Sequence, residues 1–187
     1  MAGQLCLRDF FEQPVDVVAR ELIGACARVR FQAGSFDARI VETEAYGGFD
    51  DPASHAFRGP TPRSAIMFGP AGYLYVYRSY GIHWCMNVVT QDEGSASAVL
   101  LRGAQIRNCA DGDDSSVEPE VIARGPGNLT RALGITGADN GVDCCHANAR
   151  ISFWRSLGPP EVHVNRSTRV GVSRAQDRES RYFLAET

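Results

Sequence analysis

The sequence predicts an α+β fold, a single mixed domain around a largely antiparallel sheet. Three observations predict it. The chain has 187 residues, a usual length for one domain, so the domain is expected to span residues 1–187. Short segments rich in β-branched and aromatic residues recur along it, whereas only two segments have helical periodicity. Hydrophobic residues make up 44% of the chain, which suits a soluble globular domain, and a chain of this length can hold a core without a disulfide or a metal.

The first half of the chain begins with a helix expected over residues 14–23, where apolar side chains recur at helical spacing. Pro14 suits its first turn and Gly24 its end. Strands are expected at residues 25–31 and 36–46, joined by a Gly-Ser turn. Residues 47–72 are rich in glycine and proline and have little periodicity, and loops of that length inside compact domains are usually functional.

The second half is predicted to hold a hairpin over residues 73–90, because this aromatic and β-branched run is interrupted at Tyr80-Gly81. The acidic residues 111–120 are expected to form a solvated loop. A short helix over residues 128–133 ends at Gly134. The remaining expected strands are residues 97–106, 150–154, 161–165, 169–172 and 182–185.

Composition excludes several kinds of chemistry. All 19 basic residues are arginine, so no lysine is present for a Schiff base or for a Walker phosphate loop. The six cysteines form no C-x-x-C pair and are expected to be reduced thiols, with no bound metal or cofactor. No apolar run approaches the ~18 residues of a membrane span, and the first nine residues lack a signal-peptide pattern. A cytoplasmic protein without membrane contact is therefore expected.

The charge pattern leaves room for a nucleic-acid partner. The net charge of -3 argues against one, because affinity for nucleic acid usually depends on neutralised phosphates. The arginines are segregated, however. Residues 58–107 hold five arginines against two acids, and residues 150–181 hold seven against three. The sequence therefore allows a basic face opposite an acidic one.

Two alternating runs bring candidate site residues to one face of a strand. Residues two apart share a face, so Glu42, Glu44 and Tyr46 are expected to project together. A solvent-facing strand edge explains the same spacing. The tyrosines within residues 73–77 alternate likewise, and either a packed cross-strand ladder or a base-stacking platform fits them.

His55 and Arg102 are two further candidates. His55 lies in the long loop near Arg58 and Arg63, although an isolated loop histidine is often incidental. Arg102 ends an apolar run, where an arginine suits a buried carboxylate partner such as Glu44.

Short sequence blocks spread over the chain indicate a family. They are residues 39–46 (RIVETEAY), 54–56 (SHA), 61–63 (TPR), 67–68 (MF), 75–77 (YVY), 80–81 (YG), 85–87 (CMN), 99–102 (VLLR), 125–126 (GP) and 169–172 (RVGV). In this order they closely resemble the alkyladenine (3-methyladenine) DNA glycosylase family, from residue 10 to about residue 172.

The resemblance implies a curved, largely antiparallel sheet with flanking helices and a protruding β-hairpin that enters the DNA minor groove. It implies a monofunctional DNA glycosylase of base excision repair. Such an enzyme flips 3-methyladenine, 7-methylguanine, hypoxanthine or ethenoadenine out of duplex DNA and hydrolyses the N-glycosidic bond. The implied partner is double-stranded DNA containing damaged purines, with no obligatory protein partner and with nucleoid association through DNA. Without lysine, no lyase activity is expected.

The resemblance also implies roles residue by residue. Glu44 is expected to activate the attacking water, which Arg102 and the backbone carbonyl of Val170 help to hold. Tyr46 and Tyr77 are expected to form the two stacking walls of the base pocket, and His55 to hydrogen-bond the flipped base. Asn87 is expected to exclude guanine. Tyr80 is expected to fill the gap in the duplex, and Tyr75, Ile82 and His83 to contact the groove.

Two other classes of protein stay open on sequence grounds. A noncatalytic nucleic-acid-binding module of the same fold would keep the aromatic hairpin, but it has no need for a carboxylate beside Arg102. A nucleoside hydrolase would suit the acidic net charge. It would ignore duplex DNA, whereas the binding of a glycosylase to DNA weakens steeply as salt rises.

Overall fold

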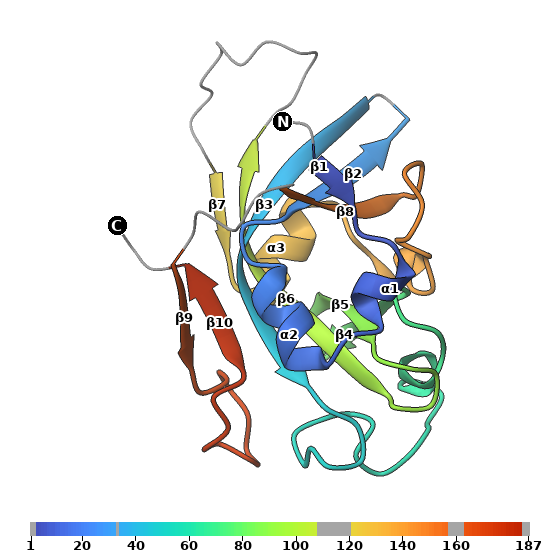
Figure 1. Ribbon diagram of the computed structural model, residues 1–187, viewed down its shortest axis with the longest axis vertical. Helices are drawn as coiled ribbons and strands as arrows, with labels where there is room; N and C mark the ends of the chain where they lie inside the picture. Colours follow the sequence, from blue (N-terminus) through green and yellow to red (C-terminus); the bar gives the residue numbers. More distant parts are fainter. Residues whose placement is uncertain (1–2, 33, 108–120, 157–162, 185–187) are drawn as a thin grey trace.

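The computed structural model describes residues 3–32, 34–107, 121–156 and 163–184, and Figure 1 shows their arrangement. These residues form ten strands of one sheet, and every strand pairing among them is antiparallel. Only short helices accompany the sheet, which confirms the predicted α+β class. No helix of the described residues is long and apolar enough to cross a membrane.

The main path through the sheet runs in the order β1-β8-β2-β3-β6-β5-β4, with β10 and β7 pairing onto β3 and β6, and β9 onto β10. In chain order the elements are β1 (Gly3–Leu5), α1 (Arg8–Phe11), α2 (Val15–Glu21), β2 (Cys26–Phe31), β3 (Gly34–Tyr46), η1 (Ala65–Phe68), β4 (Leu74–Ser79), β5 (His83–Thr90), β6 (Ser97–Arg107), β7 (Val121–Arg124), α3 (Pro126–Ala132), η2 (Gly137–Asp139), β8 (Ile151–Ser156), β9 (Val164–Ser167) and β10 (Arg181–Leu184).

Strand β3 lies at the centre of the sheet and carries the predicted acidic residues. One edge of β3 pairs with β6. The other edge pairs with β2 and, at residues 42–44, with β10. The β3–β6 register shifts twice, which leaves Val41 and Arg102 opposite no residue of the facing strand. Bulges of this kind bend a strand and re-aim side chains, and they are frequent next to functional sites. Arg102 therefore lies at an irregular point of the ladder.

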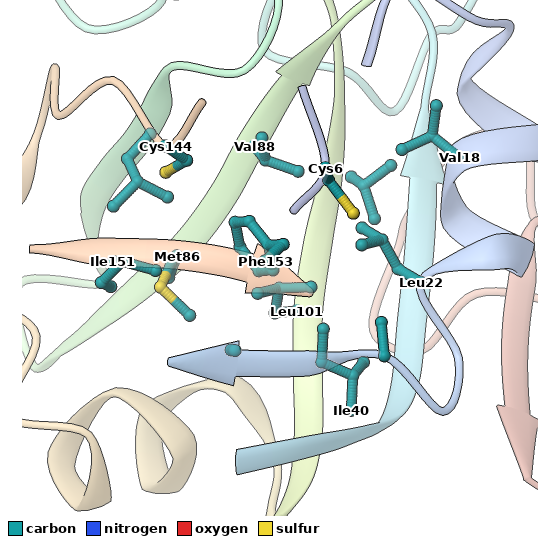
Figure 2. Close-up of a cluster of buried hydrophobic side chains, with 14 of the residues drawn as sticks. Cys6, Val18, Leu22, Ile40, Met86, Val88, Leu101, Cys144, Ile151 and Phe153 are labelled. Carbon is teal, nitrogen blue, oxygen red and sulfur yellow. The ribbon is translucent and has the colours of Figure 1, made fainter. Parts of the chain in front are cut away.

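The main core gathers apolar side chains from the sheet and from the helices on it (Figure 2). Phe153 and Leu101 are almost fully buried within it, together with Met86. Val18 and Leu22 of α2 pack on the same cluster, as their helical spacing predicts. This core fixes the position of α2 against β3 and β6.

The β4–β5 hairpin turns through Tyr80 and Gly81, as predicted. Both residues have positive φ, +49° and +70°, and the amide of Ile82 donates to the carbonyl oxygen of Ser79 at 2.9 Å. Positive φ at both central residues is the type I′ geometry, which matches the twist of the flanking strands. The side chains of Tyr80 and Ile82 are left 90% and 75% exposed at the tip.

The two predicted helices are confirmed with small changes of bounds. Helix α2 lies inside the predicted range and begins directly after Pro14. Helix α3 begins two residues before its predicted start, because Pro126 occupies the first helical position, which suits a residue without an N–H. Elements β1, α1 and β7 were not predicted, since three or four residues are too few for a periodic signal.

The prediction of a strand at residues 169–172 is wrong. This segment is irregular, and Gly171 has a φ of +74°, outside the range of extended strands. Nearby, the structure has β9 in place of the strand predicted at residues 161–165. Residues 161–162, residue 185 and the predicted acidic loop 111–120 lie outside the described residues.

The core assignment predicts the effect of one truncation. Phe153→Ala removes a fully buried ring that packs edge-on against Phe11, so the free energy of unfolding should fall by about 3–5 kcal/mol. Leu7, which is 51% exposed, provides the control, and Leu7→Ala should cost less than about 1 kcal/mol. Chemical denaturation measures both. Equal losses in the two variants would contradict the assignment.

Candidate active site

Glu44 is a fully buried carboxylate near the end of β3. It is 0% exposed, which excludes the solvent-facing edge as an explanation of its spacing. Its Oε1 accepts a hydrogen bond from the backbone amide of Val170 at 2.7 Å. Its Oε2 accepts from the Tyr46 hydroxyl at 2.8 Å and from Nη1 of Arg102 at 3.1 Å. A carboxylate without water contact needs such donors, and three segments of the chain supply them.

Arg102 joins the two glutamates that the sequence places on one face of β3. Its Nε donates to Oε1 of Glu42 at 2.9 Å, while Nη1 reaches Glu44. Burial alone would lower the pKa of Arg102, but the charges of Glu44 and Glu42 and the hydrogen bond to Glu42 outweigh it and raise that pKa. Arg181 of β10 also donates to Oε1 of Glu42, at 2.7 Å. Sequence reasoning did not identify Arg181, because only the β10–β3 register places it beside Glu42.

Tyr46 lies two residues after Glu44, with its hydroxyl on the carboxylate. Burial first, and then the charge of Glu44 and the hydrogen bond to it, raise the pKa of Tyr46, so its hydroxyl keeps its proton and acts as a donor. The guanidinium carbon of Arg169 lies 4.7 Å from the centroid of the Tyr46 ring. The ring is therefore held at its hydroxyl by Glu44 and at one face by Arg169.

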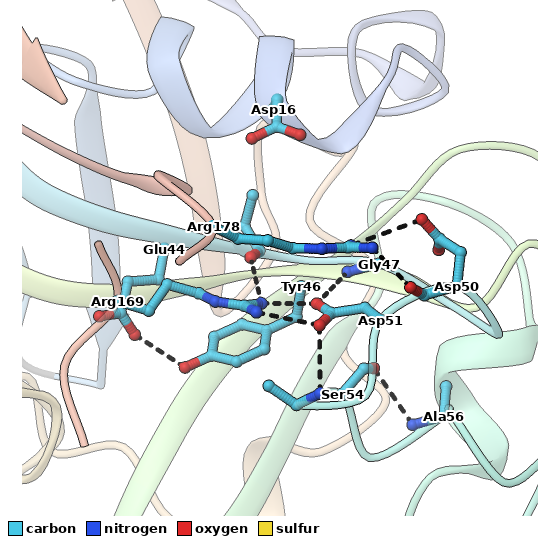
Figure 3. A network of polar contacts seen from close by, with 12 residues as sticks. Asp16, Glu44, Tyr46, Gly47, Asp50, Asp51, Ser54, Ala56, Arg169 and Arg178 are labelled. Atoms are coloured by element: carbon cyan, nitrogen blue, oxygen red, sulfur yellow. Dashed lines mark hydrogen bonds and ion pairs between the residues drawn. The ribbon is translucent and has the colours of Figure 1, made fainter. Parts of the chain in front are cut away.

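A buried ion pair between Asp51 and Arg169 lies beside these residues (Figure 3). The two side chains are 1% and 0% exposed. Nη1 of Arg169 donates to Oδ2 of Asp51 at 2.5 Å and to the carbonyl oxygen of Ala45 at 3.1 Å, and Nη2 donates to Oδ1 at 2.9 Å. Sequence reasoning missed this pair, because its partners are 118 residues apart. The signal that could have indicated Arg169 is its position directly before Val170, a predicted site residue.

His55 is brought next to the tyrosines of β4. Its Nδ1 shares a hydrogen bond of 2.8 Å with the Tyr75 hydroxyl, and its ring packs edge-to-face on Tyr77 at 4.6 Å between centroids. Desolvation first, and then the charge of Arg63, lower the pKa of His55 below its ordinary 6.5. His55 is therefore neutral at pH 7, and its Nε2 is left for another partner.

The structure corrects the expected place of Tyr75. It is 2% exposed and lies inside the protein, where its hydroxyl bonds His55, so it is not at a groove-facing surface. Tyr75 and its tilted neighbour Tyr77 pack together on β4, but their cross-strand partners on β5 are Asn87 and Cys85, so these two tyrosines form no cross-strand aromatic ladder. Asn87 is also buried, at 4% exposure, and its Nδ2 donates to the carbonyl oxygen of Tyr75 at 3.0 Å.

The remaining predicted residues lie apart from the carboxylate. Tyr80, Ile82 and His83 are exposed at and beside the hairpin tip, and His83 packs over Gly127 of α3, where an added Cβ would lie 2.6 Å from its Cδ2. The backbone amide of Val170 bonds Glu44, a contact that the sequence did not predict, and the residue is 49% exposed. The expected role of its carbonyl in holding the attacking water stays a prediction.

Comparisons with known proteins give a consistent family. A model of the methylpurine-DNA glycosylase family matches residues 9–187. A relative from Frankia casuarinae is 45% identical, over 95% of this chain and 87% of its own. A relative from Rhodopseudomonas palustris is 45% identical, over 99% and 87%. One from Methanoculleus marisnigri is 41% identical, over 94% and 92%. All three are named "Putative 3-methyladenine DNA glycosylase".

The buried ion pair predicts a pH dependence of stability. Burial raises the pKa of Asp51, but the hydrogen bonds and charge of Arg169 and the amides of Gly47 and Ala53 lower it below the ordinary 3.8. Because the pKa of Asp51 is lower in the folded state than in the unfolded state, its ionised form stabilises the fold fully above the unfolded-state pKa. This contribution is lost as the pH falls through the folded-state pKa. The free energy of unfolding should therefore decline below about pH 4, with a shallower slope in Asp51→Asn.

At neutral pH, Asp51→Asn should lose about 3–5 kcal/mol, because Arg169 is left as an uncompensated buried charge. Denaturation at about pH 7 and at a series of acidic pH values measures both effects. Asp50→Asn is the matched control, since the Asp50 side chain is 77% exposed. An Asp51→Asn variant with the stability and the acid slope of the wild type would contradict the prediction.

Proposed function

The chain belongs to the methylpurine-DNA glycosylase family, and from this premise we propose that it excises damaged purines from duplex DNA in base excision repair. The proposed substrates are 3-methyladenine, 7-methylguanine, hypoxanthine and ethenoadenine, and residues 1–187 act as one catalytic domain. The observation that carries the proposal is the buried Glu44 carboxylate, held by Arg102, Tyr46 and the Val170 amide beside a group of aromatic rings.

Glu44 is proposed to take a proton from the water that attacks the sugar C1′, while the N-glycosidic bond breaks and its electron pair leaves with the purine. A carboxylate has about four lone-pair sites. Oε2 uses two of them, for Tyr46 and Arg102, whereas Oε1 uses one, for the Val170 amide, so Oε1 has room for a water hydrogen. Glu44 has no exposed surface in the free chain. We therefore expect DNA binding to open a path for the water to Oε1.

The aromatic residues are proposed to bind the flipped base. Tyr46 and Tyr77 would stack on its two faces, and an N3-alkylated adenine is cationic, which favours electron-rich rings. Because His55 is neutral and engages Tyr75 through Nδ1, it would use Nε2 to hydrogen-bond the base. Asn87 would exclude guanine, because one N–H of its Nδ2 is engaged by the Tyr75 carbonyl and the other N–H cannot pair with the exocyclic amino group of guanine.

The exposed hairpin tip is proposed to fill the duplex. Extruding a nucleotide costs a few kcal/mol, which an inserted side chain offsets in part. Tyr80 is 90% exposed and held in a rigid type I′ turn, with Ile82 and His83 next to it for groove contact. The tip can therefore enter DNA without unfolding its strands.

The proposed chemistry predicts that Glu44→Gln greatly slows base release while duplex binding persists. Loss of a general base should slow release by about 10²–10⁴-fold. The assay uses duplexes with one of the four lesions, with Glu179→Gln, an exposed acid, as the control for the altered net charge. Because the chain has no lysine, the product should be an abasic site in an uncut strand, resolved without heat or alkali.

Each other result has a defined meaning. Unchanged release by Glu44→Gln would remove this residue from its role, and strand cleavage by the pure protein would contradict a monofunctional enzyme. Duplex binding without release by the wild type would favour a noncatalytic binding module. Release from free nucleosides with no action on duplex DNA would favour a nucleoside hydrolase.

The proposed wedge predicts a difference between substrates. Tyr80→Ala should lower the rate of base release from duplex DNA by about tenfold, because one aromatic stacking contact is worth about 1–3 kcal/mol. Release from single-stranded DNA should change less, since no duplex gap forms there. Parallel rate measurements on both substrates test this. Equal losses on both substrates would contradict the proposed wedge.

A further inference from the structure

The segment that presents the Val170 amide to Glu44 is held by a side chain rather than by strand pairing. Residues 168–172 belong to no strand and make no backbone hydrogen bond to another described backbone group. Arg169 is the residue directly before Val170, and it reaches inward to Asp51. The place of the Val170 amide therefore depends on where Arg169 is anchored.

We propose that the Asp51–Arg169 ion pair positions the catalytic site. In this proposal, which rests on the function proposed above, Arg169 sets the Val170 amide against Oε1 of Glu44 and supports the ring of Tyr46, while neither charge touches the substrate. Asp51 and Arg169 are positioning residues. They act through the base that activates water and through one wall of the base pocket.

The carboxylate of Asp51 is well placed to anchor Arg169. Its Oδ2 accepts from the amide of Gly47 at 3.0 Å and its Oδ1 from that of Ala53 at 3.1 Å, so its own loop orients the carboxylate. The loop itself is tightly seated, since a Cβ on Gly48 would lie 2.1 Å from the carbonyl oxygen of Ser95. Arg169 therefore bonds to a carboxylate whose position is already set.

The same anchor reaches two other predicted site residues. The carbonyl oxygen of Asp51 accepts from the amide of Ser54, and Oγ of Ser54 accepts from the amide of Ala56 at 3.2 Å, which braces the backbone on both sides of His55. Arg169 lies on the Tyr46 ring at 4.7 Å. Figure 3 shows these contacts converging on the ion pair from β3, from the loop and from the irregular segment.

Stability alone does not account for the pair. A buried ion pair adds little over well-packed apolar side chains, and this one leaves Nε of Arg169 buried without a hydrogen-bond partner among the described residues. Removing one partner leaves an unpaired buried charge, whereas removing both is often tolerated. The double variant therefore separates positioning from stability.

The test compares Arg169→Met and Asp51→Asn with the double variant Asp51→Asn/Arg169→Met. We expect lower melting temperatures in the single variants and recovery in the double variant. The single-turnover rate of base release should fall by about 10- to 100-fold in all three, because small misplacements of catalytic groups carry costs of that size. The duplex Kd should stay within about threefold, since phosphate contacts dominate it.

Matched controls come from the neighbouring exposed pair. Arg178 and Asp50 lie in the same two segments, with a contact of 3.5 Å and side chains 40% and 77% exposed. Arg178→Met and Asp50→Asn make the same chemical changes without removing a buried contact. Both controls should keep the melting temperature and the rate of the wild type.

A second readout does not need activity. The amide of Val170 should exchange its hydrogen at least about tenfold faster in Arg169→Met and in the double variant than in the wild type, because its bond to Glu44 is lost. Amides of β6 serve as the internal reference. Arg169→Lys, which keeps the charge with fewer donors, should give intermediate protection and an intermediate rate.

The outcomes separate this inference from the proposed function. Recovery of both the rate and the Val170 protection in the double variant would mean that the pair only stabilises the fold, and would overturn the inference. Wild-type rates in folded single variants would overturn it as well. If the wild type releases no base, the proposed function fails, while the exchange of the Val170 amide still decides whether the ion pair positions this segment.

Discussion

The burial of one negative charge organises this site. Glu44 has no contact with solvent, and a carboxylate in that state is stable only when donors and a countercharge replace the lost water. The donors come from different parts of the chain, since Arg102 lies on β6, Tyr46 at the end of β3, and Val170 after β9. Folding must therefore bring these segments together before the charge can be accommodated.

The antiparallel sheet supplies most of that convergence. Strand β3 pairs with β6 on one edge and with β10 on the other, so basic side chains from both neighbours can reach its two glutamates. The register shift opposite Arg102 releases this residue from the regular ladder, and its guanidinium bridges Glu42 and Glu44. In a regular ladder the side chains would simply alternate between the two faces, and no bulge would re-aim Arg102.

The buried charged side chains lie apart from the exposed side chains of the hairpin tip. Arg169 and Asp51 are in the interior, where a low dielectric strengthens fixed polar contacts. Tyr80 and Ile82 are at the tip of a hairpin whose turn geometry is set by positive φ angles. His55 packs against the tyrosines of β4, and desolvation together with the charge of Arg63 lowers its pKa, so its ring is neutral at pH 7.

Local sequence determined the longer strands, the hairpin turn at Tyr80-Gly81, and the shared face of Glu44 and Tyr46, because residue period and turn chemistry act over a few neighbouring positions. The same local reasoning predicted a strand at residues 169–172 that does not form. Tertiary structure alone decided that Arg169 pairs with Asp51, that Arg181 reaches Glu42, that the Val170 amide meets Glu44, and that Tyr75 is buried. Periodicity says which face a residue takes but not which distant segment will cover that face, and that choice follows from strand register and from the need to pair every buried charge.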